Sequence, residues 1–204
     1  MPVAALIVYA VWFAMTFGLR TFIQWRRTGS SGFKGIGGRP GSLEWIAGVL
    51  FTVALVVGVA GPVADLAGLA PLIDAAWLPG LGLVVAVLGV GLTLAAQISM
   101  GNSWRIGVDE DERTDMVTDG AFAIVRNPIF SAMVLTAIGL TAMVPNVVSV
   151  IGLVALVVAL ELQVRVVEEP YLATVHGEPY EQYRRRVGRF LPRRRPDDGG
   201  ADAV

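Results

Sequence analysis

Long apolar stretches alternate with short polar ones along most of the chain. Five of them are rich in Val, Leu, Ile and Ala, and they cover Val3–Gln24, Leu43–Ala60, Leu81–Met100, Ile129–Val144 and Val147–Leu162. A helix needs roughly 20 apolar residues to cross a bilayer core, and the first three stretches approach that length. The last two are shorter and are separated only by Pro145 and Asn146, so we expect an antiparallel helical hairpin. The pattern predicts an all-α, polytopic membrane protein with about five transmembrane helices.

Polar and small residues mark where these helices begin, end and pack. Ser42 precedes the second stretch and suits an N-cap, because its hydroxyl can accept from a first-turn N–H. Gly61 and Pro62 follow that stretch and are expected to end or bend the helix. Gly89 and Gly91 lie inside the third stretch. We favour close packing against a neighbouring helix for both glycines over room for a ligand.

The distribution of Lys and Arg predicts the orientation in the membrane. The loop after the first stretch carries Arg26, Arg27, Lys34 and Arg39, and the C-terminal segment is rich in arginine, whereas Val63–Trp77 has neither Lys nor Arg. Basic loops stay on the cytoplasmic side. We therefore expect the N-terminus outside the cell inner membrane and the C-terminus in the cytosol. The Gly101–Asn127 loop then also faces the cytosol, on the same side as the C-terminal segment.

The C-terminal part is expected to contain two short amphipathic cytosolic helices between Glu168 and Leu191. Gly177 would break the first, and Pro179 fits the first turn of the second. The chain thus divides into residues 1–100 with three spans, residues 101–192 with a polar loop, the hairpin and a cofactor-binding segment, and residues 193–204 with the composition of a disordered tail.

Composition excludes several kinds of site. The formal net charge is −1, so no global basic field favours a nucleic acid as partner. The sequence has no cysteine and a single histidine, His176, which argues against thiol catalysis and against a metal site. Neither a GxxxxGK loop nor a strand–GxGxxG–helix unit is present, so a Rossmann-type nucleotide site is not expected.

Two polar clusters flank the predicted hairpin. The first is Arg126-Asn127-Pro128. The second consists of Glu161, Arg165, Glu168 and Glu169, whose helical spacing predicts pairing of Arg165 with Glu161 and with Glu168 or Glu169. A self-neutralising ladder at a helix end is one explanation, and an N-cap alone explains Asn127-Pro128. Charge so close to lipid is costly, however, and usually has a function. We expect the two clusters to face each other and hold a small polar ligand at the membrane surface.

The order of short motifs gives a more specific interpretation. GNSW is followed by DGAFAIVRNPIF, EEPYL, HGEPYEQY and RFLP. This order resembles the isoprenylcysteine carboxyl methyltransferase and phospholipid methyltransferase superfamily, which consists of integral membrane enzymes that use S-adenosylmethionine. The resemblance covers roughly residues 89–192. It implies an S-adenosylmethionine-dependent methyltransferase that acts on a lipophilic small molecule or lipid, such as an isoprenoid carboxylate or a lipid amine.

The same resemblance implies the site residues. Arg126 and Glu168 would be catalytic, and the cofactor would be bound by Arg126, Asn127, Phe130, Glu168, Glu169, Tyr180 and Tyr183, with no metal. Asn127 stands where the family usually has histidine, and Phe130 where it has tyrosine. Two alternatives stay open, an NADPH-dependent membrane reductase of the sterol type and a non-catalytic membrane scaffold.

Overall fold

The computed structural model describes residues 1–31, 35–101 and 116–193. Within them the chain is helical and forms no strand, with a single isolated parallel bridge between Val125 and Gly188. Most of the GNSW motif, the acidic run of the following loop, Lys34 and the tail after Arg193 lie outside the described residues. The all-α prediction is confirmed for the described part of the chain.

Two long helices each contain a π-helical segment. The first runs as α1 (Pro2–Phe13), η1 (Ala14–Leu19) and α2 (Arg20–Thr28), and the last as α6 (Val147–Leu162), η4 (Gln163–Glu168) and α7 (Glu169–His176). A π-helical segment has a wider turn than an α-helix and often occurs at functional sites. It also changes which residues share a helix face. The periodicity of apolar residues in the sequence does not predict this change, because it assumes a regular α-helix.

The other α-helices are α3 (Leu43–Leu66), α4 (Leu78–Ser99), α5 (Pro128–Met143) and α8 (Glu178–Arg186), and a short 3-10 helix, η3, covers Gly120–Ala123. The predicted N-cap of α3 is confirmed, since Ser42 Oγ accepts from Trp45 N–H at 3.2 Å. The turn between α5 and α6 is closed by Asn146, whose Oδ1 accepts from Ser149 N–H at 3.0 Å. Gly177 adopts a positive φ of 56° between α7 and α8, which is a conformation that glycine allows at little cost.

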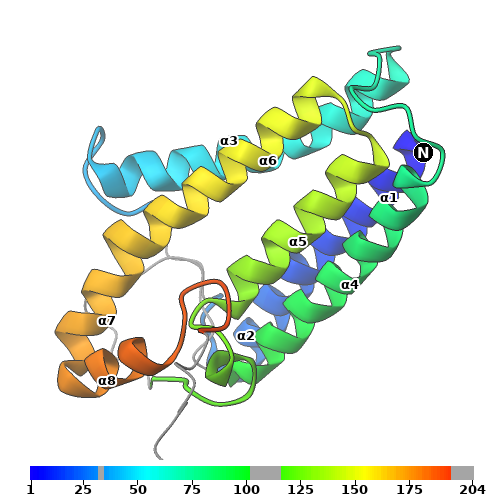
Figure 1. Ribbon diagram of the computed structural model, residues 1–204. Coiled ribbons are helices and arrows are strands. Elements are labelled where there is room, and N and C mark those ends of the chain that lie inside the picture. The colour runs from blue at the N-terminus through cyan, green and yellow to red at the C-terminus, as the bar shows by residue number, and fades with distance from the viewer. Residues whose placement is uncertain (32–34, 102–115, 194–204) are drawn as a thin grey trace, which may run out of the picture.

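The helices form two packed groups (Figure 1). In one group α5 packs along α4 and in the other α6 packs along α3, and α1 contacts both groups. The hairpin is therefore open, because α5 and α6 meet at residues 144–146 and then diverge, each joining a different group (Figure 1). One hydrophobic cluster forms around Ala86, Leu140 and Met143. The other forms around Ala54, Leu156 and Leu160 and also receives side chains of α5, so it connects the two groups.

Glycine permits the close contact of α4 with α5. A Cβ atom on Gly89 would lie 2.6 Å from the backbone nitrogen of Thr136, so no larger residue fits there without moving a helix. Packing at Gly89 is thus confirmed. At Gly91 an added Cβ would meet nothing within 4 Å among the described residues, so Gly91 makes no such close contact within the described part of the chain.

The predicted end of the second span at Ala60 is also wrong, because α3 continues through Gly61 and Pro62 to Leu66. Proline inside a helix removes one backbone donor. Here both residues are buried, and the fully buried Asn146 donates from Nδ2 to the carbonyl of Gly61 at 2.9 Å. Tertiary packing against the hairpin turn therefore keeps the segment helical.

Four helices are long and apolar enough to cross a membrane: Pro2–Thr28, Leu43–Leu66, Leu78–Ser99 and Val147–His176. α5 is apolar but has only 16 residues, fewer than the roughly 20 that a full crossing requires. Apolar side chains such as Val56, Leu88 and Val154 are more than half exposed on the outer surface. Such a surface suits lipid as its solvent, which supports an integral membrane protein.

Candidate functional site

A cavity of about 800 Å³ lies between the two helix groups. Its volume is in the range of small-molecule and cofactor sites. All seven residues predicted for cofactor binding or catalysis line it: Arg126, Asn127, Phe130, Glu168, Glu169, Tyr180 and Tyr183. Both π-helical segments also contribute to its wall, through Thr16 and Phe17 on one side and Gln163 and Glu168 on the other. Arg126, Asn127 and Pro128 of the first cluster thus meet Glu168 and Glu169 of the second, whereas Glu161 and Arg165 do not line the cavity.

A buried ion network forms the polar wall of the cavity. Arg126 and Glu169 pair at 2.9 Å, with side chains only 8% and 10% exposed. Arg189, from the segment after α8, donates to both carboxylate oxygens of Glu169 at 2.8 and 2.7 Å. A planar guanidinium suits such bidentate contact with a carboxylate. Glu169 therefore joins the start of the hairpin to the C-terminal segment.

The expected charge ladder on the last helix is only partly present. Arg165 pairs with Glu161 at 2.5 Å, as predicted, in an exposed position. Its predicted partner Glu169 is bound by Arg126 and Arg189 instead. The π-helical segment Gln163–Glu168 lies between Glu161 and Glu169, and its wider turn changes the spacing that would align Arg165 with Glu169.

The segment after α8 is bound to the start of α5. Arg126 and Asn127 donate backbone N–H groups to the carbonyls of Gly188 and Arg189 at 2.8 and 3.0 Å. The Asn127 side chain also donates to Arg189 O at 3.2 Å, and it does not cap α5. Asn127 therefore fastens the C-terminal segment, although it occupies the N-cap position.

Arg189 was absent from the expected site residues. Its signal in the sequence was the RFLP motif, to which it contributes the arginine. A contact between residues 20 positions apart, across two helices and a turn, cannot be derived from helical spacing. Gln97 was also missed. It donates from Nε2 to the carbonyl of Thr16 at 3.0 Å, and both residues line the cavity from the side of the first helix.

Two buried tyrosines on α8 complete the polar wall. Arg126 Nη1 donates to the Tyr180 hydroxyl at 3.4 Å, and Tyr183 donates from its hydroxyl to the carbonyl of Phe122 at 2.6 Å. Burial raises the pKa of Tyr183 to about 12, although the nearby positive charge of Arg126 opposes the shift. Burial, followed by the charge of Glu169, also raises the pKa of Tyr180. Both hydroxyls stay protonated near neutral pH and are thus donors there.

The raised pKa of Tyr183 predicts a pH dependence of stability. An unfolded tyrosine titrates near pH 10, and the folded value is about 12. The stabilisation is therefore complete below pH 10 and is lost as the pH rises toward 12. We expect the thermal unfolding midpoint of the native protein to fall more steeply over this window than that of Tyr183→Phe. Equal slopes for the two proteins would contradict the assignment.

The opposite part of the cavity is apolar. Its wall there includes Phe13 and Phe17 from the first helix, Phe51 and Leu55 from α3, and Met133 from α5. These residues belong to segments of the predicted spans. One cavity therefore combines charged groups at the helix ends with an apolar surface within the spans.

Comparisons with known proteins agree with this arrangement. The family model described as "Phospholipid methyltransferase" matches residues 77–179. Protein-S-isoprenylcysteine O-methyltransferase B of Arabidopsis thaliana is 27% identical over 144 residues, which cover 70% of this chain and 73% of that protein. Protein-S-isoprenylcysteine O-methyltransferase of Schizosaccharomyces pombe is 34% identical over 108 residues, which cover 52% of this chain and 45% of that protein.

The fold is also similar to a solved structure. The eukaryotic intramembrane Ras methyltransferase, an isoprenylcysteine carboxyl methyltransferase, superposes with a TM-score of 0.63 at 22% sequence identity. The match covers 91% of this chain and 63% of that one. The likeness supports the membrane fold, and the names of these proteins favour a methyltransferase over the reductase alternative.

Proposed function

The chain belongs to the phospholipid methyltransferase family, and from this premise we propose that it is an integral membrane enzyme that transfers a methyl group from S-adenosylmethionine to a lipophilic acceptor. The observation that carries the proposal is the single cavity of about 800 Å³ with a charged wall and an apolar wall. A polar donor and an apolar acceptor need these two environments side by side.

The charged wall fits the chemistry of the methyl donor. S-adenosylmethionine has a carboxylate, an ammonium group and ribose hydroxyls, and when bound it supplies an electrophilic methyl group. Arg126 can attract a carboxylate, and its buried Nε has no hydrogen-bond partner among the described residues. The carboxylate of Glu168 can accept from ammonium or hydroxyl groups. Asn127, Phe130, Glu169, Tyr180 and Tyr183 surround these two groups in the same wall.

Positioning supplies most of the expected rate enhancement, because methyl transfer is an in-line displacement that requires aligned reactants at near-attack distance. The Arg126–Glu169–Arg189 network connects residues of the charged wall to the segment after α8. A carboxylate acceptor needs no general base, whereas an amine or hydroxyl acceptor must lose a proton. Glu168 is the candidate base in that case, because Tyr183 stays protonated at neutral pH. An isoprenoid carboxylate or a lipid amine are the acceptor classes that fit.

The cavity also suits the proposed position in the membrane. We propose that α5 is a short fifth span beside the four longer ones and that the N-terminus lies outside. The charged wall would then lie at the cytosolic surface, where S-adenosylmethionine is available. α8 would then lie along that surface, whereas α7 is not the separate short helix that the sequence predicts, because it continues the last long helix. The acceptor would enter from the lipid phase between the spans.

Ligand-dependent thermal stability tests the proposed cofactor site. A ligand at about 100 times its dissociation constant adds about 2.7 kcal/mol to the free energy of unfolding. We expect S-adenosylhomocysteine to raise the unfolding midpoint of the purified protein and NADPH to leave it unchanged. The shift should be lost in Glu168→Gln, whereas Glu161→Gln should retain it, because Glu161 does not line the cavity.

The outcomes separate the alternatives. Stabilisation by NADPH alone would favour a reductase. No stabilisation by any of these ligands would leave a non-catalytic scaffold as the better explanation. An unchanged response of Glu168→Gln would show that the cofactor binds elsewhere.

A further inference from the structure

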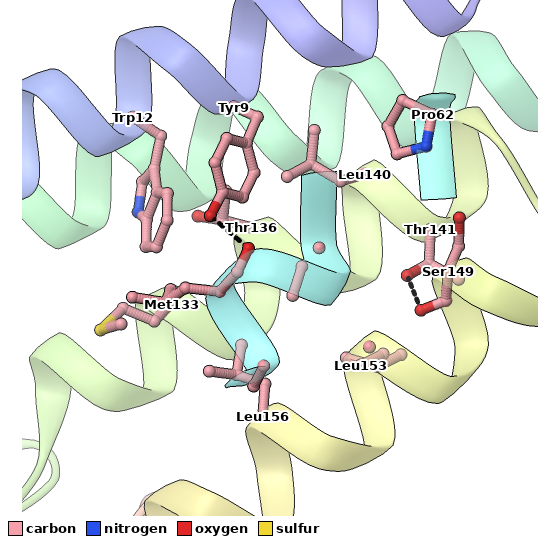
Figure 2. Close-up of a pocket in the computed structure, with 15 residues that line it drawn as sticks. Tyr9, Trp12, Pro62, Met133, Thr136, Leu140, Thr141, Ser149, Leu153 and Leu156 are labelled. Atoms are coloured by element: carbon pink, nitrogen blue, oxygen red, sulfur yellow. Dashed lines mark hydrogen bonds between the residues drawn. The ribbon is translucent and has the colours of Figure 1, made fainter. Parts of the chain in front are cut away.

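A second, smaller cavity lies where α1, α3, α5 and α6 meet, with about 40 Å³ of space (Figure 2). In Figure 2 the side chains of Trp12 and Met133 border one side, and Pro62 and Thr141 lie toward the other. Since about 10–15 Å³ of such space holds one water-sized group, the cavity accommodates roughly three of them.

The hydroxyl groups around this cavity are mostly bonded within the protein. Tyr9 donates to Leu55 O at 2.7 Å, Thr136 to Ala132 O at 2.9 Å and Thr141 to Ser149 O at 3.4 Å. The Ser149 hydroxyl lies against Gly61, where an added Cβ would clash with it. Two buried polar atoms of lining residues, Trp12 Nε1 and Ser149 Oγ, have no hydrogen-bond partner among the described residues. The other lining side chains are mostly apolar, and a mostly apolar cavity favours apolar groups.

The small cavity adjoins the large one. Leu55 and Met133 line both, so these two side chains form the boundary between them. Met133 is buried, and its unbranched side chain can adopt several conformations without a backbone movement. The apolar part of the large cavity therefore continues toward the small cavity through a boundary that a flexible side chain controls.

We infer that the small cavity is a subsite for the far end of the acceptor's apolar tail, and that Met133 and Ala137 determine how long a tail can be accommodated. Met133, Ala137 and Thr141 follow one another at i, i+4 and i+8 on α5, so they lie on one helix face. All three line the small cavity, with Ala137 between the boundary and the far side. This inference rests on the proposed function, which places the tail in the large cavity.

Trp12 provides a built-in reporter for the subsite, because it lines the small cavity and is only 3% exposed. The other four tryptophans would be replaced with phenylalanine, and the full chain reconstituted in lipid nanodiscs. Linear alcohols with a terminal bromine, lengthened by one methylene at a time, would serve as probes. Bromine quenches tryptophan fluorescence at contact, and lipid cannot reach Trp12 directly.

We expect saturable quenching of Trp12, with a dissociation constant that falls about fourfold for each added methylene until the tail fills the subsite. Ala137→Leu should shorten the longest tail that still gains affinity, because its side chain blocks the cavity midway. Ala137→Ser should not, because it leaves the space open. Met133→Ala should let longer tails gain affinity, whereas Met143→Ala should not, since Met143 is buried on the same helix but lines neither cavity.

Two results would overturn the inference: no saturable quenching of Trp12 by any probe, or the same length limit in Ala137→Leu and Ala137→Ser. If the tryptophan variant does not fold, stabilisation of the unmodified chain by the same alcohols gives the length limit instead. These measurements need no methyl donor. A failure here would therefore leave the S-adenosylhomocysteine result intact, and a failure of cofactor binding would leave the tail subsite intact.

Discussion

Replacing Glu169 with glutamine is expected to lower the free energy of unfolding by about 3–5 kcal/mol, the cost of removing one partner from a buried ion pair. The substitution preserves shape but leaves Arg126, only 8% exposed, without its carboxylate partner, and it leaves Arg189 with the longer contact to Glu161 at 3.8 Å. Methyl transfer should fall by about 100-fold or more, because a shift of about 1 Å in a catalytic group can cost that much. Chemical denaturation and a methyl-transfer assay measure the two effects.

Glu161→Gln is the matched control, since it makes the same change earlier in the same long helix. Its pair with Arg165 is exposed, with side-chain exposures of 37% and 59%. Glu161 also lies 3.8 Å from Arg189, a longer contact than the 2.7 Å between Glu169 and Arg189. Exposed pairs contribute about 0–1 kcal/mol, so the control should remain stable and active. Equal effects of the two substitutions would show that the network around Glu169 does not organise the site.

Replacing Gly89 with alanine is expected to lower the free energy of unfolding by about 1–3 kcal/mol, the usual cost of overpacking. Its Cβ would lie 2.6 Å from Thr136 N and 2.8 Å from Thr136 Cα, so α4 and α5 would have to move apart. Arg126 and Asn127 directly precede α5, so a movement of α5 would displace them. We therefore also expect weaker binding of S-adenosylhomocysteine.

Gly91→Ala tests the same change two residues further along α4. An added Cβ there meets nothing within 4 Å, and alanine is the better helix former by up to about 1 kcal/mol. The variant should be as stable as the native protein or more stable. Denaturation curves of the two variants should therefore shift in opposite directions or by clearly different amounts, and equal destabilisation would contradict the observed helix contact.

The sequence predicts the helices well, because apolar runs, Ser42, Asn146 and Gly177 mark positions that local chemistry determines. The two helices of the hairpin lie within one residue of their predicted bounds. The meeting of the two polar clusters followed from the predicted hairpin, which places both at the same membrane surface. All seven expected site residues line one cavity for this reason, and their roles remain predictions.

Other features depend on tertiary packing, and the amino-acid sequence contains little signal that predicts them. The π-helical segments Ala14–Leu19 and Gln163–Glu168 change helix faces that periodicity treats as regular. The divergence of α5 and α6 creates the large cavity, yet two short apolar helices joined by Pro145 and Asn146 would equally suit a closed hairpin. Arg189 reaches Glu169 only because residues 187–192 fold back onto the start of α5. The different environments of Gly89 and Gly91 likewise follow from which side of α4 faces α5.

The most direct test of the central claim is transfer of a labelled methyl group from S-adenosylmethionine into apolar product. The reconstituted protein would be incubated with membrane lipids or with S-prenylated cysteine, and the organic extract analysed. We predict label in the apolar fraction that depends on the protein and is lost in Glu168→Gln but retained in Glu161→Gln. Absence of label from every apolar product, or equal labelling by the two variants, would contradict the account.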